Sequence, residues 1–282
     1  MKYFFILSLF ISTALNAQDK KAYQLFDSKG KKVSYGKMLK YMLQQDVLLF
    51  GEYHNNPIVH WLQLELTTDL GAQRKLILGA EMFEADNQLP LTQYVNGEID
   101  EKKFKEQARL WKNYPTDYAP LVNYAKANKL PFIATNIPRL FASLVNKGGF
   151  EALDTLNTVQ KTWIAPLPIP YDAELPGYKN MMKMMGDHAT PNMPKAQASK
   201  DATMAYFILK NFTAGSLFVH YNGTYHSDNY EGILWYLKKN NPGLKYATIA
   251  SVSQKDLSKL LDEHKGKADF ILCVDEDMTT TY

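Results

Sequence analysis

A four-residue pattern, Gly-x-Tyr-His, occurs twice in this sequence of 282 residues. Gly51-Glu52-Tyr53-His54 directly follows the apolar residues 47–50, and Gly223-Thr224-Tyr225-His226 comes shortly after the apolar residues 216–221. Imidazole and carboxylate side chains can transfer protons or bind divalent metal ions. A repeated pattern of these residues behind two buried-strand sequences is therefore the first indication of a functional site.

Further polar side chains follow other apolar runs. Glu81 comes directly after residues 76–80, Asn136 and Arg139 come after residues 131–135, and His220 lies within residues 216–221. In open α/β sheets, ligands bind outside the carboxyl ends of the strands. We therefore expect these side chains to gather at one edge of a sheet.

The sequence predicts that four of these side chains converge on one site: Glu52, His54, Glu81 and His226. Two imidazoles and two carboxylates could form a divalent-metal cluster or a general acid–base set. The alternative is that each side chain caps a helix or satisfies backbone groups in a loop, because buried polar groups need partners.

The apolar runs alternate with amphipathic segments. Strands are predicted over residues 47–50, 76–80, 131–135, 216–221, 246–250 and 270–274. Helices are predicted over residues 58–70, 88–95, 101–110, 118–128, 196–212 and 255–262. Trp61, Leu62, Leu66 and Leu70 are expected to form the buried stripe of the first helix. This alternation predicts an α/β fold with a mostly parallel central sheet and helices on both faces.

Residues 163–196 interrupt this rhythm with many prolines and methionines and one predicted short helix at residues 178–185. Long excursions within compact domains are often lids or binding elements. The alternative is a surface insertion whose methionines pack it onto the sheet. The predicted fold therefore includes a Pro/Met-rich helical excursion.

Composition excludes several classes of protein. A hydrophobic content of 46 % with 22 % charged residues indicates a globular chain, and the net charge of +3 gives no basic excess for nucleic acid. The one cysteine, Cys273, excludes an intrachain disulfide and a cysteine-based zinc cage. His60 and His264 are expected at the surface.

Residues 1–17 are predicted to be a secretory signal peptide, because one lysine precedes a short apolar run and Ala17 offers a cleavage point. No later stretch reaches the roughly 18 apolar residues that a spanning helix needs. We therefore expect residues 18–282 to form a single exported domain, periplasmic or secreted. No cysteine lies near the cleavage point to carry a lipid anchor.

Several motifs in order resemble the ChaN-like family of haem-binding uptake proteins. The resemblance covers residues 34–252 and rests on Gly51-Glu52-Tyr53-His54-Asn55-Asn56 with His60, Gly79-Ala80-Glu81-Met82-Phe83, Ala134-Thr135-Asn136-Ile137-Pro138-Arg139, and Ala196-Gln197 with Asp201-Ala202-Thr203-Met204-Ala205. The wider Tiki superfamily includes TraB-type proteins, which are described as metal-dependent proteases. Erythromycin esterase-like hydrolases are similar to the family as well.

The resemblance implies an exported protein of haem or iron acquisition that holds haem iron through a tyrosine. Phenolate oxygen is a suitable ligand of ferric haem. The excursion offers the expected haem contacts, with Tyr178 preferred as the iron ligand over Tyr171 and His188. Its other expected contacts are Met181, Met185 and Lys179.

Two functions thus remain open at this point. The first is haem binding, with an unidentified haem donor or acceptor protein and a homodimer among the alternatives. The second is a metal-dependent hydrolase of protease or esterase type, in which Glu52, His54, Glu81 and His226 would be catalytic.

Overall fold

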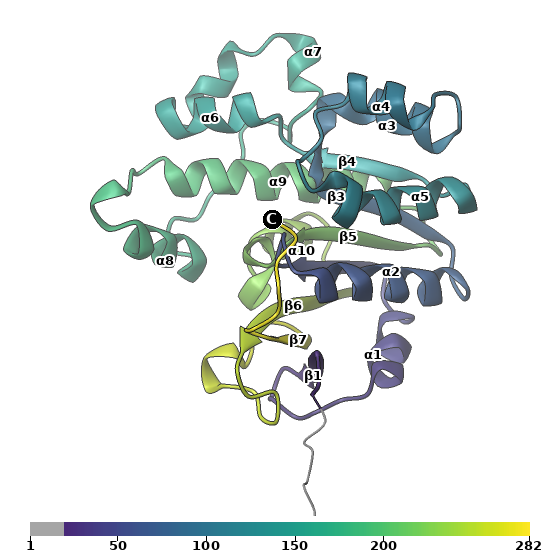
Figure 1. Ribbon diagram of the computed structural model, residues 1–282. Coiled ribbons are helices and arrows are strands. Elements are labelled where there is room, and N and C mark those ends of the chain that lie inside the picture. Colours follow the sequence, from purple (N-terminus) through teal and green to yellow (C-terminus); the bar gives the residue numbers. More distant parts are fainter. Residues whose placement is uncertain (1–19) are drawn as a thin grey trace, which may run out of the picture.

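The computed structural model describes residues 20–282, so the predicted signal peptide lies outside the described residues. Its centre is one seven-stranded sheet (Figure 1). The strands are β1 (Tyr23–Asp27), β2 (Val47–Glu52), β3 (Leu76–Glu84), β4 (Phe132–Asn136), β5 (Leu217–Gly223), β6 (Tyr246–Gln254) and β7 (Phe270–Asp275).

The strand order across the sheet is β1-β7-β6-β2-β5-β3-β4. Every neighbouring pair is parallel except β1 with β7, which is antiparallel. The predicted mostly parallel α/β fold is therefore confirmed. The motif-bearing strands β2 and β5 are direct neighbours, with β3 on the other side of β5.

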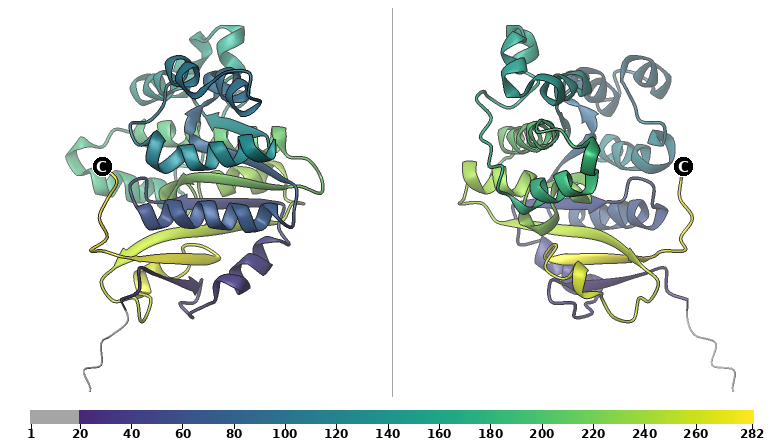
Figure 2. Two further views of the ribbon diagram at one scale, coloured as in Figure 1. Left: turned by 45° about the vertical axis from the view of Figure 1, so that its right-hand side comes forward. Right: turned by 90° about the vertical axis from the view of Figure 1, so that its left-hand side faces the viewer.

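Helices cover both faces of the sheet, as Figure 2 shows. They are α1 (Tyr35–Met42), α2 (Pro57–Gly71), α3 (Gln88–Val95), α4 (Glu101–Gln107), α5 (Ala119–Asn128), α6 (Arg139–Gly148), α7 (Thr158–Lys161), α8 (Pro176–Met185), α9 (Met193–Asn211) and α10 (Ile233–Asn240). Apolar side chains of α1 to α5 form one core with the sheet. Those of α6, α9 and α10 form the core on the opposite face.

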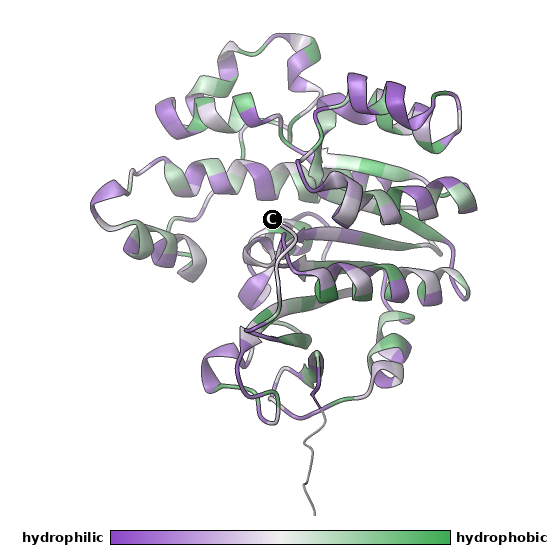
Figure 3. Ribbon diagram, in the orientation of Figure 1, coloured by the Kyte–Doolittle hydropathy of each residue, from purple (hydrophilic) through white to green (hydrophobic). Residues whose placement is uncertain are grey.

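Alternating side chains of each central strand enter opposite cores. In β2, Leu48 and Phe50 pack with α1 to α5, whereas Val47 and Leu49 pack with α6, α9 and α10. All four are fully buried, which explains why this strand reads as a continuous apolar run rather than an alternating one. Figure 3 shows the same contrast between mostly hydrophobic strands and helices that mix hydrophobic with hydrophilic residues.

Some predictions about individual elements were wrong. The helix predicted at residues 255–262 is absent from this part of the chain, which forms turns and a short 3₁₀ helix at Asp262–His264. The Gln254 side chain bonds the backbone of Asp256, Lys259 and Leu261, and these bonds compete with helical ones. The additional strand β1 was not predicted, because it lacks a long apolar run.

The predicted surface histidines are in fact buried, and one predicted core residue is exposed. His60 and His264 have only 7 % and 8 % of their surface accessible, whereas Trp61 has 47 %. His60 is buried because its ring lies between polar partners in a network described below. Hydrophobic periodicity alone does not reveal such a network, because it predicts that Trp61 is buried and that its polar neighbour His60 is exposed.

The excursion contains α8, which joins through a short 3₁₀ turn, Gly186–His188, to the segment before α9. Figure 1 shows α8 beside the N-terminal part of α9, and contacts between the two helices confirm this placement. After β7 the chain turns back toward the centre of the molecule, and its last residues lie near the ends of the central strands (Figures 1 and 2). Within residues 20–282, no helix is both long and apolar enough to cross a membrane.

Candidate functional site

The two Gly-x-Tyr-His motifs pack against each other. Glu52 lies opposite Gly223 in the parallel register of β2 and β5. A Cβ atom on Gly223 would stand 2.7 Å from His54 Nε2, and one on Gly51 would stand 2.8 Å from the Ile249 carbonyl oxygen and 2.9 Å from the Thr224 backbone. A side chain at Gly223 would thus meet the first motif, and one at Gly51 would meet both β6 and the second motif. This close approach brings both histidines to one pocket.

Glu52 is a fully enclosed carboxylate with three donors. Its Oε1 accepts from the Tyr118 hydroxyl at 2.9 Å and lies 2.9 Å from His54 Nδ1. Its Oε2 accepts from Gln63 Nε2 at 2.6 Å. Because the carboxylate is an acceptor, Nδ1 of His54 carries the proton and the neutral tautomer has its free lone pair on Nε2.

His54 itself is only partly enclosed, since 32 % of its side chain remains accessible. The Trp111 ring packs edge-on against it, with ring centroids 4.9 Å apart. Burial alone would lower the pKa of His54, but the negative charges of Glu52 and Glu81 outweigh it and raise the pKa above its ordinary 6.5. His54 is thus an oriented, accessible and comparatively basic imidazole.

His226 is held quite differently, between two carboxylates. Its Nδ1 lies 2.5 Å from Asp201 of α9, and its Nε2 lies 3.2 Å from Glu81 of β3. The Gln197 side-chain amide also contacts Nδ1 at 2.8 Å. Burial works against charge on this ring, but the two carboxylates raise the pKa of His226 to about 10. His226 is therefore a buried imidazolium with no lone pair to offer.

The pKa values of the two carboxylates around His226 are shifted in opposite directions. Burial raises the pKa of Asp201. Burial also acts on Glu81, but the charge of His226 and the Gly223 amide hydrogen bond, at 2.6 Å, outweigh it and lower the pKa of Glu81 below its ordinary 4.5. Glu81 is consequently an ionised carboxylate that ties β3 to the second motif.

Behind the motifs, buried polar networks fix their positions. The His60 ring lies 3.1 Å from both Gln63 Oε1 and the His54 carbonyl oxygen, which orients the Gln63 amide toward Glu52. His220 lies under the second motif, 2.8 Å from the Thr135 hydroxyl and 3.1 Å from Asn222 Oδ1. Burial lowers the pKa of His220 to about 4, so this ring is neutral.

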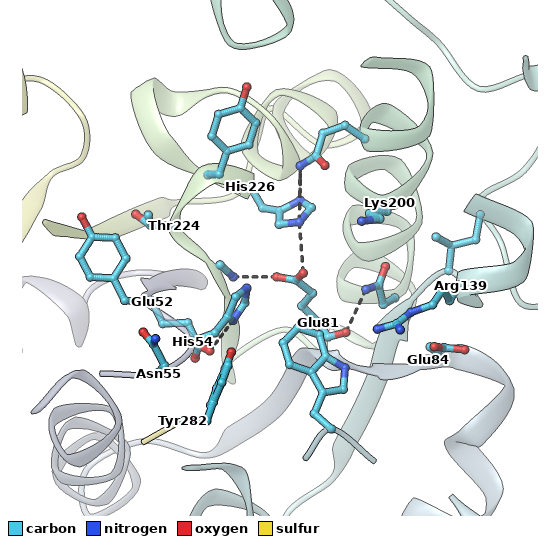
Figure 4. A pocket seen from close by; sticks show the side chains of 17 residues that line it. Glu52, His54, Asn55, Glu81, Glu84, Arg139, Lys200, Thr224, His226 and Tyr282 are labelled. Carbon is cyan, nitrogen blue, oxygen red and sulfur yellow. Dashed lines mark hydrogen bonds and ion pairs between the residues drawn. The ribbon is translucent and has the colours of Figure 1, made fainter. Parts of the chain in front are cut away.

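A pocket of about 660 Å³ opens at the carboxyl ends of β2, β3, β4 and β5, and we call it the strand-end pocket. Figure 4 shows His54, Glu81 and His226 facing it, with Arg139 and Lys200 on the opposite side from His54. Its full lining is Glu52, Tyr53, His54, Asn55, Glu81, Glu84, Trp111, Asn136, Ile137, Arg139, Gln197, Lys200, Gly223, Thr224, Tyr225, His226 and Tyr282.

The predicted strand-end residues thus come together, apart from His220, which lies beneath the pocket rather than in its lining. Their arrangement is two histidine–carboxylate pairs. The expected divalent-metal cluster is not supported, because no group of three or more His, Cys, Asp or Glu side chains in residues 20–282 is placed to hold a metal ion. Both ring nitrogens of His226 are directed toward carboxylates, so this ring has no lone pair for a metal ion, whereas His54 uses only Nδ1 in its pair with Glu52.

The excursion borders a second pocket of about 470 Å³, which we call the excursion pocket. Tyr178 lines it but is 95 % buried, and its hydroxyl has no hydrogen-bond partner among the residues that the structure describes. Burial and the nearby Asp201 raise the pKa of Tyr178 well above its usual range. Tyr178 also packs on Tyr171, with ring centroids 5.4 Å apart.

The other expected haem contacts of the excursion point elsewhere. His188 is exposed, Lys179 pairs with Glu174, and neither lines the strand-end pocket or the excursion pocket. Met181 is half-buried and Met185 is exposed, and they too are absent from both linings. Tyr225 and Gln197 line both pockets, so the two cavities adjoin at these side chains.

Sequence reasoning did not single out several residues of this site: Gln63, Trp111, Lys200 and Tyr282. Gln63 and Tyr118 act on Glu52 from other elements, and no local pattern reveals such contacts. Lys200 could have been found from its position three residues after Gln197, because residues at this spacing lie on the same face of a helix. Tyr282 reaches the pocket because the Thr281 amide donates to the Asn55 carbonyl oxygen at 2.9 Å.

The family model of haem-binding uptake proteins of the Tiki superfamily, ChaN, matches residues 38–237, which is more than half of the chain. The chain belongs to this family. The match to the ChaN family includes β2, β3, β4 and β5, and with them both Gly-x-Tyr-His motifs. No curated protein matches the sequence.

Solved structures of low sequence identity share the fold of this ChaN-family chain. ChaN of Campylobacter jejuni, solved with cofacially bound haem, has a TM-score of 0.67 at 19 % identity, covering 90 % of this chain and 98 % of that one. A mutant of the erythromycin esterase EreC has a TM-score of 0.53 at 8 % identity, covering 93 % and 99 %. A Bacillus cereus protein reaches 0.50 at 10 % identity, covering 90 % and 95 %.

The strand-end pocket contains side chains that could contact a haem group. It offers aromatic surface from Trp111, a partly exposed phenol from Tyr225, and the cations Arg139 and Lys200. Its volume lies within the range of cofactor pockets. Within residues 20–282, the enclosed Oδ1 of Asn136 has no hydrogen-bond partner.

Proposed function

We propose that this protein binds haem in the strand-end pocket. The observation that carries the proposal is that this pocket, in a chain of a haem-binding family, joins an oriented imidazole and aromatic side chains to two cations. An apolar macrocycle with carboxylate side chains needs both kinds of surface. The excursion then forms one neighbouring wall instead of the main binding surface.

Tyr225 is the tyrosine that would hold the iron. Its side chain is 40 % exposed and lies where the two pockets adjoin, whereas Tyr178 is enclosed. Burial and nearby carboxylates, Asp201 first among them, raise the pKa of Tyr225 to about 12. Ferric iron favours the deprotonated phenol strongly enough to offset such a shift. Bound haem would supply the ferric centre that this oxygen ligates.

The chain's own residues would hold the rest of the ligand. His54, fixed by Glu52, can donate or accept one hydrogen bond at Nε2 beside the iron ligand. Trp111 offers apolar contact next to it. His226 stays charged and buried, so its role is to lock Glu81 and the second motif in place. We place this binding in haem or iron acquisition by an exported protein, as the predicted signal peptide suggests.

Titration with haemin, followed by absorbance, tests this assignment. We expect saturable binding with the spectrum of oxygen-ligated ferric haem. Tyr225→Phe should lose that spectrum, whereas Tyr178→Phe, the matched change of a buried tyrosine, should keep it. Loss in Tyr178→Phe with retention in Tyr225→Phe would return the iron to the excursion.

A second candidate function is hydrolysis by general acid–base chemistry. The specific observation is that three hydrogen bonds hold the Glu52 carboxylate, which in turn orients His54 with Nε2 as the free nitrogen. A histidine oriented by a carboxylate is a suitable general base for activating water. Ester and peptide hydrolysis, measured in the unmodified protein and in His54→Gln, tests it. Equal rates in the two proteins would remove this candidate.

A further inference from the structure

Both backbone groups of Gly177, near the start of α8, form hydrogen bonds with the body of the protein. The Gly177 carbonyl oxygen accepts from the Tyr225 hydroxyl at 2.6 Å, and the Gly177 amide donates to Glu231 Oε2 at 2.7 Å. A Cβ atom at this position would stand 2.7 Å from the same Glu231 oxygen. Glycine therefore permits this close approach, and we call the two hydrogen bonds together the Gly177 contact.

Beyond the Gly177 contact, α8 contributes little buried surface. Within this helix only Tyr178 is buried, and residues 186–188 after it are exposed. The N-cap residue is Leu175, whose apolar side chain cannot accept a hydrogen bond, so Glu231 accepts one from the first turn instead. Figure 1 shows α8 at the periphery of the molecule, beside α9. Segments with few buried groups open at a low cost in free energy.

The Tyr225 oxygen cannot take part in the Gly177 contact and hold haem iron at the same time. In the Gly177 contact this oxygen carries a proton and donates to a carbonyl oxygen. On ligation of ferric iron the O–H bond breaks, the iron–oxygen bond forms and the iron stays ferric. The proton passes to solvent, since 40 % of the Tyr225 side chain is exposed. Two acceptor oxygens cannot form a hydrogen bond with each other, so ligation ends this half of the contact.

We infer that the excursion is a lid, and that ligation of haem iron by Tyr225 releases it from the body of the protein. This inference rests on the proposed function. Ligation and the Gly177 contact compete for one oxygen, so each weakens the other by the same factor. Because α8 lines one side of the excursion pocket, its release opens that pocket. The empty and the loaded protein would then differ in the position of α8.

Hydrogen exchange of the α8 amides, measured by mass spectrometry on the full protein, tests the release. Without ligand, Tyr225→Phe and Glu231→Ala each remove one hydrogen bond of the Gly177 contact, so exchange over α8 should rise about 5-fold. Tyr171→Phe, within the excursion, and Glu263→Ala, in the lining of the excursion pocket, are matched controls. They make the same chemical changes and leave the Gly177 contact in place, so their exchange should equal that of the unmodified protein.

The second arm adds ligand to the unmodified protein. Saturating haemin should accelerate exchange over α8 by a similar factor. Metal-free protoporphyrin, which has the same ring and carboxylates but no iron, should leave this exchange unchanged. Because the competition is reciprocal, Glu231→Ala should also lower the Kd for haemin by about 3-fold, whereas Glu263→Ala should not change it.

Each arm has an outcome that contradicts the inference. Haemin binding that leaves exchange over α8 unchanged, or slows it, would overturn the release while leaving haem binding intact. Equal acceleration by metal-free protoporphyrin would overturn its dependence on iron. Unchanged exchange in unliganded Tyr225→Phe and Glu231→Ala would overturn the role of the Gly177 contact. No saturable binding of haemin would overturn the proposed function and the release with it.

Discussion

The two Gly-x-Tyr-His motifs lie side by side on β2 and β5, yet their histidines have opposite characters. His54 has one carboxylate partner, and a third of its side chain is accessible. His226 is buried between Asp201 and Glu81, and its pKa is raised to about 10. The same four-residue pattern therefore places one histidine to meet a ligand and the other to hold the site together.

The difference comes from residues outside the motifs. Gln63 and Tyr118 donate hydrogen bonds to Glu52, the single carboxylate beside His54. The His54 ring still faces the pocket. Asp201, delivered by α9, adds a second carboxylate to His226 and removes it from ligand binding. A motif thus sets the position of a side chain, whereas partners from distant segments set its charge and its availability.

The two histidines are expected to differ most in how much each contributes to the free energy of unfolding. His226→Gln should lower the free energy of unfolding by about 3–5 kcal/mol, because it leaves two buried carboxylates without their cation. His54→Gln should cost about 1 kcal/mol, since the side chain is partly exposed and its partner Glu52 keeps two other donors. Urea denaturation of both variants measures the contrast, and equal losses would contradict it.

The stabilising contribution of His226 is expected to depend on pH. The pKa of His226 is raised from 6.5 to about 10, so its contribution is complete below pH 6.5 and is lost as the pH rises toward 10. The unmodified protein should therefore lose stability relative to His226→Gln between these pH values. Urea denaturation of both proteins between pH 6.5 and pH 10 measures this difference. A difference in unfolding free energy that stayed constant over this range would contradict a charged His226.

At low pH, the stability of the protein is expected to depend on the protonation of Glu81. The pKa of Glu81 is lowered from its ordinary 4.5, so its contribution is present above that pH and is lost as the pH falls below it. Because Glu81 depends on His226 for this shift, His226→Gln should show a weaker loss of stability on acidification. The acid limb of the same titration provides this measurement.

A smaller effect is expected at the first motif. Glu52→Gln removes the negative charge that helps to raise the pKa of His54, so that pKa should fall toward or below 6.5. NMR titration of the His54 ring protons measures it directly. The matched change Glu84→Gln, at another carboxylate of the pocket lining, should leave the His54 pKa within about 0.3 units. An unchanged pKa in Glu52→Gln would show that Glu52 does not control this ring.

The sequence permits prediction of the strands and of the convergence at their ends, because both follow from local pattern. Continuous apolar runs identify strands buried on both faces, and parallel strands bring their carboxyl ends to one edge. Glu52, His54, Glu81 and His226 share a pocket for this reason. The seventh strand escaped prediction because β1 joins the sheet through pairing with β7, and its own sequence gives no such signal.

The partners of these side chains could not be predicted, since they arise from tertiary contacts. The burial of His60 depends on Gln63 and on the His54 carbonyl group, and neither contact leaves a periodic pattern. The resemblance to the ChaN-like family implied a haem, and the tyrosines and methionines of the excursion were its expected contacts. Their packing places most of them outside the two pockets described here.

The position of the haem iron is the most direct test of haem binding in the strand-end pocket. Crystals grown with haemin, measured at the iron absorption edge, give an anomalous difference peak at the metal. We expect this peak within the strand-end pocket and within bonding distance of the Tyr225 oxygen. A peak beside His188 or on the outer face of α8, with the strand-end pocket empty, would contradict it.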